Sequence, residues 1–527
     1  MTPNPSQPTV AVAGGGLAGL AAACALADSG FHVTLFEKRP YLGGRASSYE
    51  HPGTGEVVDN CQHVLLGCCT NLIEFYRRTG VEDKIRWYDK LVFLEPGGRA
   101  SFIAPSFPPA PMHGAPAFLR AACLGWRDKL AIARAMMILA GVLPDGAREP
   151  LQTRASGRTV VRDTGGNFLA WLRRQHQTEQ AIQRFWKTIL VSALNEDLDR
   201  VSVRYAAQVV RESFLKSPAG GRMGVPTVPL TDLYNAAGDY VRARGGVLHF
   251  RRPVEGFGAE SSRVRVRLGD QEEAFDFLII ALPFDALESV LPDAPESAPL
   301  REKLSRFESS PITGIHLWFD RQISDLDYAV LLDRTIQWMF HKSRLQPMRS
   351  EGASRAGSYV ELVVSSSKTL IEKSRSEIVD MALSELREFF PAARDAKLVK
   401  STVIKEVNAT YSPRPGIDAH RPSATTAWPR VFLAGDWTAT GWPATMEGAV
   451  RSGYLAAEAL ARAARQEERC FLSPDLPATG FMRIFARESK CPRSHNPSSI
   501  RPVGRRRPRP GAPRSSGGGP PFREGRS

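Results

Sequence analysis

Three side chains that could move or orient a proton stand close together near residue 60. Asp59, Gln62 and His63 follow the short stretch 56–58, which predicts a strand that ends directly before them. The ordinary pKa of histidine lies near neutral pH, so His63 is the natural candidate for a general acid. A single histidine is as often structural, and from these residues alone both interpretations stay open.

A glycine pattern near the start of the chain is of the kind that holds phosphate groups. Gly14, Gly16 and Gly19 fit G-x-G-x-x-G and lie between an apolar strand at 10–13 and an alanine-rich helix at 20–27. The first glycine permits a tight turn, the second lets backbone approach a pyrophosphate, and the third lets the helix pack closely on the strand. The helix N-terminus then offers free N–H groups to the phosphates.

An acidic residue and a second pair of glycines follow. The predicted strand 32–36 ends at Glu37, 23 positions after Gly14, close to the roughly 20 expected of a ribose-binding carboxylate. Gly43 and Gly44 then directly precede Arg45. They indicate a second close approach of backbone to an anionic ligand, with a guanidinium nearby; an ordinary surface turn is the alternative.

A strand, a glycine and a helix recur near the other end of the chain. The apolar strand 431–434 leads into Gly435 and Asp436, and a helix is predicted from about Met446 to 464. This turn would return the chain to the same ligand, and the new helix start offers further amide donors. The alternative is a closing strand–helix unit without a ligand.

Length and composition indicate a globular protein. The 527 residues leave room for two or three domains, and 43% of them are hydrophobic. The net charge is +14, but residues 481–527 alone hold 12 Lys/Arg and 2 Asp/Glu. Because the rest is nearly balanced, we expect no nucleic-acid partner. The stretch 466–527 is rich in Pro, Gly, Ser and Arg and is predicted to be a disordered basic tail.

Cysteine usage and hydropathy point to a cytoplasmic location. Seven scattered cysteines form no paired C-x-x-C motifs, so we predict no metal site and a reducing compartment. No uncharged apolar run is long enough to predict a membrane-spanning helix. The stretch 117–142 is unusually apolar with interspersed arginines and predicts one or two amphipathic helices. They are either buried in the core or form a peripheral contact with the inner membrane or an apolar substrate.

Motifs at both chain ends carry a resemblance to a known family. They are Gly14-x-Gly16-x-x-Gly19, Glu37, Gly43-Gly44-Arg45, Gly435-Asp436 and Met446-Glu447-Gly448-Ala449-Val450. Together they resemble the flavin-dependent amine oxidase and phytoene desaturase superfamily. The resemblance implies an α/β fold whose Rossmann-like FAD-binding domain is discontinuous, over 8–95, 224–290 and 425–465. It also implies a discontinuous α+β substrate domain over 96–223 and 291–424.

Three more stretches narrow the resemblance to one branch. They are Asp59-Asn60-x-Gln62-His63-Val64-Leu65-Leu66-Gly67, Ser310-Pro311-Ile312 with His316-Leu317-Trp318-Phe319-Asp320, and Ala434-Gly435-Asp436-Trp437-Thr438-x-Thr440-Gly441-Trp442-Pro443. They are similar to the squalene-associated desaturases, the hydroxysqualene dehydroxylases of bacterial hopanoid synthesis. The resemblance covers about residues 8–464.

The resemblance implies FAD as the cofactor and assigns residues to each part of it. The pyrophosphate would lie on Gly14, Gly16, Ala18 and Gly19, with Gly44 and Arg45 beside it toward the flavin. Glu37 would bind the adenosine ribose, and the backbone of Val254 would meet the adenine. Gly435 and Asp436 would hold the ribityl region, and the amide of Met446 would meet the isoalloxazine edge.

The implied reaction is removal of the hydroxyl group of hydroxysqualene to give squalene. His63 would then be the acid, while Gln62 and Asp59 orient it or the leaving oxygen. The implied partners are an apolar isoprenoid substrate, an electron donor that the sequence does not identify, and upstream synthases of the squalene pathway. The alternatives are a carotenoid-type desaturase, an amine oxidase, and a nucleotide-binding scaffold without activity. The stretch 312–319 has no lysine and no cysteine adjoins Met446, which weakens the amine-oxidase alternative.

Overall fold

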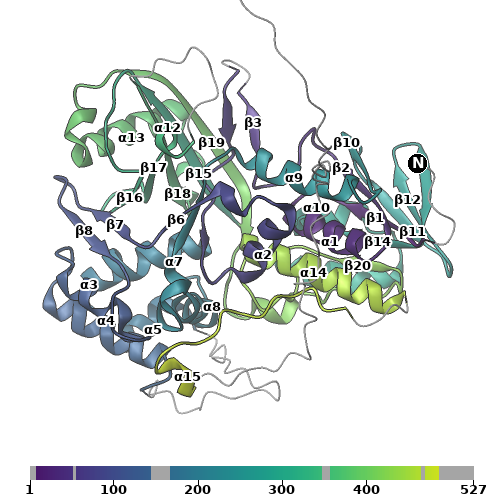
Figure 1. Cartoon of the computed structure of the whole chain (residues 1–527), viewed down its shortest axis with the longest axis horizontal. Coiled ribbons are helices and arrows are strands. Elements are labelled where there is room, and N and C mark those ends of the chain that lie inside the picture. Colours follow the sequence, from purple (N-terminus) through teal and green to yellow (C-terminus); the bar gives the residue numbers. More distant parts are fainter. Residues whose placement is uncertain (1–6, 52–54, 144–165, 347–356, 465–468, 486–527) are drawn as a thin grey trace, which may run out of the picture. The chain divides into compact units, whose positions relative to one another are not determined.

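The structure is a computed structural model that describes residues 7–51, 55–143, 166–346, 357–464 and 469–485 (Figure 1). Within these ranges, no helix is long and apolar enough to cross a membrane. No group of three or more His, Cys, Asp or Glu side chains in the same ranges is arranged to hold a metal ion.

A parallel sheet gathers strands from three distant parts of the chain. Its order is β10-β2-β1-β14-β20, and every neighbouring pair is parallel (Figure 1). The strands are β1 (Thr9–Ala13), β2 (His32–Glu37), β10 (Val247–Phe250), β14 (Phe277–Ile280) and β20 (Val431–Leu433). β1, β14 and β20 are continuous apolar runs because both faces of this sheet are covered. The N-terminal and C-terminal strands predicted above therefore belong to one sheet.

Two helices pack on this sheet with very little space between them. α1 (Leu17–Asp28) is buried along its length except at Asp28, and it lies against α14 (Met446–Ala463). A Cβ atom at Gly453 of α14 would lie 2.2 Å from the carbonyl oxygen of Ala18. Glycine is therefore needed there for the two helix backbones to touch. A third helix, α9 (Leu230–Arg242), also packs on α1.

A second sheet of seven strands is mostly antiparallel, with the order β19-β15-β18-β17-β16-β7-β8. Helix α13 (Arg375–Phe389) covers one face of it, where Ile315 and Leu362 are fully buried. The opposite face carries the residues that alternate with these. The strands are β7 (Leu91–Leu94), β8 (Ala100–Ile103), β15 (Ser309–Phe319), β16 (Tyr328–Leu331), β17 (Trp338–His341), β18 (Ser358–Ser365) and β19 (Leu398–Tyr411).

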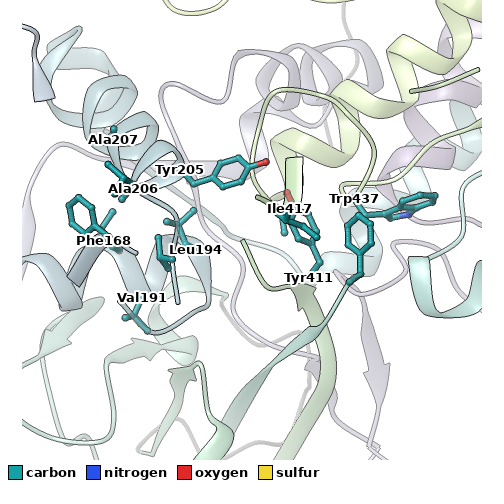
Figure 2. Close-up of a cluster of buried hydrophobic side chains, with 14 of the residues drawn as sticks. Phe168, Val191, Leu194, Tyr205, Ala206, Ala207, Tyr411, Ile417 and Trp437 are labelled. Atoms are coloured by element: carbon teal, nitrogen blue, oxygen red, sulfur yellow. The ribbon is translucent and has the colours of Figure 1, made fainter. Parts of the chain in front are cut away.

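Six helices of the stretch 115–210 share an extensive apolar core. Figure 2 shows part of it, with Phe168, Leu194 and Tyr205 from the helices and Tyr411 and Trp437 from the C-terminal part of the chain. The predicted helical stretch 117–142 forms two of these helices. The helices are α3 (Ala115–Arg120), α4 (Trp126–Leu139), α5 (Phe168–Arg174), α6 (Glu179–Ala181), α7 (Thr188–Leu194) and α8 (Val203–Val210).

Shorter elements connect the parts. They include small sheets of β3 (Ser48–Glu50) with β4 (Val57–Asp59), of β5 (Leu65–Leu66), β9 (Met223–Pro226) and β6 (Ile85–Tyr88), and of β11 (Gly256–Ala259), β12 (Val264–Leu268) and β13 (Gln271–Phe275). Short helices are α2 (Thr70–Thr79), α10 (Phe284–Leu287), α11 (Ala298–Leu304) and α12 (Lys342–Leu345). The strand predicted directly before the polar cluster is β4, and Asp59 is its last residue.

Part of the segment predicted to be a disordered tail is ordered. Residues 469–485 run along the folded chain and end in the short helix α15 (Met482–Phe485). The amide of Phe471 donates to the Glu458 carboxylate at 2.6 Å, and that of Phe481 donates to the Ala110 carbonyl at 2.9 Å. Met482 is buried in the core and anchors this segment. Residues 466–468 and 486–527 of the predicted tail lie outside the described residues.

The contact between α1 and α14 leads to the first prediction. Replacing Gly453 by Ala forces the two backbones apart, and we expect it to cost about 1–3 kcal/mol of stability, as overpacking does. The thermal unfolding midpoint should fall, although alanine favours the helix more than glycine does. The matched control is Gly258→Ala, because a Cβ atom there meets nothing within 4 Å. Equal midpoints for the two variants would show that the contact is not tight.

Candidate active site

A cavity of about 760 Å³ runs from the glycine turn of the parallel sheet to the seven-stranded sheet. Gly14, Gly16 and Glu37 line one part of it. Apolar side chains such as Phe93 and Phe340 line another. A concave site with a polar region and an apolar region can hold an anionic ligand beside an apolar one.

The glycine turn has the geometry that its spacing predicts. Gly14 has a positive φ of 108°, and a Cβ atom there would lie 2.7 Å from the Ala281 carbonyl oxygen. A Cβ atom on Gly19 would lie 1.9 Å from the carbonyl oxygen of Gly14, so the helix can pack on the turn only with glycine there. Gly16, by contrast, has open space beside it, with only the Cα of Gly44 at 3.9 Å.

This open space fits the pyrophosphate of a dinucleotide. α1 begins beyond Gly16 with no side-chain cap, so its first amides are not satisfied by a capping side chain. Leu17 and Ala18, the first residues of the helix, line the cavity. Backbone donors at a helix N-terminus attract an anion, and a Cβ atom on Gly16 would project into its space.

Glu37 is held in place by the backbone around it. One carboxylate oxygen accepts from the Gly15 amide at 2.7 Å and the other from the Arg39 amide at 2.8 Å. The carboxylate lines the cavity, and each oxygen keeps a lone pair that can accept from a ribose hydroxyl. Val254 lines the cavity nearby in the chain segment after β10.

A charge pair joins the two chain ends at the cavity. Arg45 donates to the Asp436 carboxylate at 2.7 Å and to the Ala409 carbonyl at 2.8 Å. Burial by itself lowers the pKa of Arg45, but the Asp436 carboxylate outweighs it, so the pKa is raised and the guanidinium stays charged. Asp436 is itself positioned by the buried Arg421, which donates to its backbone carbonyl at 2.9 Å.

The start of α14 also faces the cavity. Met446 is its first residue and lines the cavity, and the Thr445 hydroxyl caps the helix by accepting from the Gly448 amide at 3.1 Å. Gly435, two residues after the end of β20, lines the same cavity. The residues predicted to contact the cofactor thus all line one cavity, except Gly19, which packs behind it. They are Gly14, Gly16, Ala18, Glu37, Gly44, Arg45, Val254, Gly435, Asp436 and Met446.

His63 lines the cavity as a neutral imidazole. Its Nδ1 lies 2.7 Å from the Cys61 carbonyl oxygen, which can only accept, so Nδ1 carries the proton. Burial lowers the pKa of His63 from its ordinary value. In this tautomer, Nε2 is free to accept a hydrogen bond or a proton.

Gln62 also lines the cavity, but its side-chain amide is occupied by the protein. Its oxygen accepts from the ammonium group of Lys342 at 2.8 Å, and its nitrogen donates to the His63 carbonyl at 3.0 Å. Gln62 therefore connects a buried lysine to the backbone of His63. It can orient the cavity wall more readily than it can bind a ligand.

Asp59 lies behind the wall, which differs from the expectation that it orients a leaving oxygen. It is not among the residues that line the cavity. Its carboxylate accepts from Ser48 Oγ at 2.6 Å, from the Leu230 amide at 3.1 Å and from Lys342 Nζ at 2.5 Å. Burial raises the pKa of Asp59, but Lys342 outweighs it and the pKa is lowered. Any effect of Asp59 on the cavity therefore passes through Lys342 and Gln62.

Two further buried residues complete this cluster, and neither they nor Lys342 were predicted from the sequence to belong to the site. Glu361 on β18 is fully buried, with one oxygen 3.5 Å from Lys342 Nζ, and neither oxygen has a hydrogen-bond partner among the described residues. Burial raises the pKa of Glu361 to about 7. His316 lies opposite it on β15, with Nδ1 2.8 Å from the Tyr359 hydroxyl, and burial lowers the pKa of His316 to about 3.

Glu361 gives the stability of the protein a pH dependence of defined sign. Its ordinary pKa is 4.5 and its folded pKa is about 7, so the folded chain holds an extra proton between these values. The stabilising contribution is complete below pH 4.5 and is lost as the pH rises through 7. We therefore expect the unfolding midpoint of Glu361→Gln, relative to wild type, to rise as the pH goes from about 5 to about 8.

The buried histidines are present in both the wild type and Glu361→Gln. Their contributions to the pH dependence of stability therefore cancel when the two are compared. The control is Glu302→Gln, which changes an exposed glutamate. Its midpoint should follow that of the wild type at every pH. A difference between Glu361→Gln and wild type that does not change with pH would contradict the prediction.

The chain matches a known family over most of its length. The family described as flavin containing amine oxidoreductase matches residues 17–461. A 15-cis-phytoene desaturase of Synechococcus elongatus is 28% identical over 485 residues, which are 87% of this chain and 96% of that protein. The 15-cis-phytoene desaturase of Arabidopsis thaliana is 26% identical over 491 residues, which are 87% of this chain and 81% of that protein.

Solved structures of similar fold are more distant in sequence. Putrescine oxidase bound to putrescine has a TM-score of 0.63 at 18% identity and covers 87% of this chain and 98% of that one. Cyclohexylamine oxidase from Brevibacterium oxydans has a TM-score of 0.61 at 17% identity and covers 87% of this chain and 100% of that one. With FAD as its cofactor, this chain belongs to the flavin-containing amine oxidoreductase family, as an oxidoreductase of the phytoene and carotene desaturase class.

Proposed function

We propose that this protein removes the hydroxyl group of hydroxysqualene to give squalene, as an FAD-dependent step of hopanoid biosynthesis. The observation that supports the proposal is a polar stretch of cavity wall that adjoins apolar side chains such as Phe93 and Phe340. This stretch starts at Asn60, which donates to the carbonyl of Arg45 at 3.1 Å, and continues through Gln62 and His63. Arg45 is one of the residues expected to lie beside the cofactor. A hydrocarbon needs no polar partner, whereas an isoprenoid alcohol has a hydroxyl group to be bound and released.

FAD, when bound and reduced, supplies a hydride. The C–O bond of the substrate breaks, the hydride forms the new C–H bond, and the hydroxide takes one proton and leaves as water. His63 can bind the hydroxyl through Nε2 and, when protonated, provide that proton. Apolar side chains that line the cavity, such as Leu91, Phe93 and Val363, exclude the water that would compete for the electron-deficient carbon.

A second candidate is desaturation of a carotenoid-type hydrocarbon. It is supported by the similarity to proteins named phytoene desaturases. In that reaction oxidised FAD would supply the hydride acceptor, and a base of the protein would take the proton from the neighbouring carbon. A neutral His63 with a free Nε2 suits that role as well. An amine oxidase ranks third, because the polar groups of the cavity wall include no lysine on β15.

The product decides between the first two candidates. We expect the purified yellow protein, reduced with dithionite without oxygen, to convert hydroxysqualene into squalene. Oxidised protein given phytoene and a quinone acceptor should leave the phytoene unchanged. Gas or liquid chromatography with mass detection measures both. New double bonds in phytoene, with hydroxysqualene unchanged, would assign the protein to the second candidate.

The role of His63 gives a separate prediction. His63→Ala should retain flavin absorbance but lose activity by roughly a hundredfold or more, the usual contribution of an acid or base. As an acid with a lowered pKa, His63 is protonated in a smaller fraction of molecules as the pH rises, so kcat should fall with rising pH above that pKa. If His63 were instead the base of a desaturase, kcat would rise with increasing pH and then level off above the pKa of His63.

The control is His420→Ala, which removes a histidine that does not line this cavity. Its rate and its pH profile should match those of the wild type. If His63→Ala also keeps the wild-type rate and profile, His63 is only structural.

A further inference from the structure

A glutamate of the seven-stranded sheet belongs to the wall of the cavity. Glu406 of β19 is half-buried and lines the cavity, as do Ala409 and Thr410 of the same strand. Its partner on β15, Ile312, lines the cavity as well. Glu406 was not predicted from the sequence to belong to the site, and neither candidate reaction described so far uses it.

The strand pairing is irregular directly beside Glu406. Between two consecutive strand pairs, β15 has only Pro311, whereas β19 has residues 407–409. Proline has no backbone N–H to donate to the ladder. Glu406 and Thr410 line the cavity, but Asn408, which strict alternation would place with them, is exposed. Glu406 therefore lies at a bulge, a feature that is frequent next to active sites and redirects the side chains there.

One hydrogen bond holds the carboxylate of Glu406. Its Oε2 accepts from Asn60 Nδ2 at 3.1 Å, and the same nitrogen donates to the Arg45 carbonyl at 3.1 Å. Within the described ranges of the chain, Oε1 has no hydrogen-bond partner, and neither oxygen forms an ion pair. The lone pairs of Oε1 can therefore face a ligand in the cavity.

The carboxylate lies next to a residue that is expected to adjoin the cofactor. Arg45 donates to the Ala409 carbonyl, three residues beyond Glu406, at 2.8 Å. The guanidinium of Arg45 also pairs with Asp436 at 2.7 Å. Because this cation already has a carboxylate partner, the carboxylate of Glu406 adds a negative charge to the wall that Arg45 does not neutralise.

We infer that Glu406 is a further catalytic residue, whose carboxylate stabilises the positive charge that develops on the reacting carbon of an isoprenoid substrate. The carboxylate forms no bond with that carbon and transfers no proton. It lowers the free energy of the charged species by electrostatic attraction, which is strong in a cavity that excludes water.

The inference rests on the isoprenoid substrate of the proposed function but not on the direction of hydride transfer. In the dehydroxylation, the charge develops as the C–O bond breaks. In a desaturation, it would develop as the hydride leaves the carbon. Either reaction therefore places positive charge in the part of the cavity that this carboxylate lines.

A purely structural role would be to fix Asn60 in the wall, and Glu406→Gln separates the two roles. Glutamine has nearly the same size as glutamate, and its Oε1 can still accept from Asn60. The variant thus removes the charge and leaves the hydrogen bond. A control is Glu302→Gln, which changes an exposed glutamate that does not line the cavity.

Binding of a carbocation mimic tests the inference without turnover. The probe is an ammonium analogue of the isoprenoid, in which a protonated tertiary amine replaces the reacting carbon, and squalene is the uncharged comparison. With FAD bound, the full-length wild type should bind the ammonium analogue about tenfold more tightly than Glu406→Gln does. Both proteins should bind squalene equally. Changes in the flavin absorbance spectrum measure these dissociation constants.

Single-turnover rates give the second readout. Glu406→Gln should retain FAD and convert hydroxysqualene about a hundredfold more slowly than the wild type, and Glu406→Asp should recover part of the rate. Glu302→Gln should match the wild type in rate and in binding.

Equal binding of the ammonium analogue by wild type and Glu406→Gln overturns the inference, even if the wild type makes squalene. So does an unchanged rate, or a loss of squalene binding as large as the loss of ammonium binding. A wild type that converts neither hydroxysqualene nor phytoene contradicts the proposed function instead. The ammonium analogue then still shows whether Glu406 attracts a positive charge in the cavity.

Discussion

Direct contact between backbones is the constraint on which the cavity depends. The carbonyl of Gly14 meets the helix at Gly19, the backbone of Gly44 meets Gly16, and the carbonyl of Ala18 meets Gly453. No side chain separates the two backbone segments of each pair. The distance between the two segments is therefore fixed by their direct contact. The space left beside Gly16 is therefore fixed by contacts that any larger residue would push apart.

A buried charge cluster plays the corresponding role on the substrate side. Lys342 holds two carboxylates and the amide oxygen of Gln62, and through Gln62 it fixes the backbone of His63. Such a cluster costs desolvation free energy and contributes little net stability compared with apolar packing. What it does provide is a single arrangement of the polar wall. The position of this wall is thus set by charged side chains that do not themselves line the cavity.

The sequence predicted the features that depend on local spacing. The glycine turn and the start of α14 follow from patterns within about ten residues, Glu37 follows from its place 23 positions after Gly14, and all of them line one cavity. The ion pair of Asp59 with Lys342 joins residues 283 positions apart, at the end of β4 and the start of α12, and no local pattern encodes that contact. A charged residue within the apolar run of β18 was the only signal for Glu361. The division into two domains stays a prediction.

The strand order of the parallel sheet has a consequence for how the protein is made. β1 is synthesised more than 400 residues before β20 and α14, which complete the sheet and the cavity beside it. A chain still growing on the ribosome therefore has the glycine turn but not Asp436 or Met446. The cavity is complete only once α14 has been made, and a product that ends before β20 would expose the unpaired edge of β14 and the side of α1 that α14 covers.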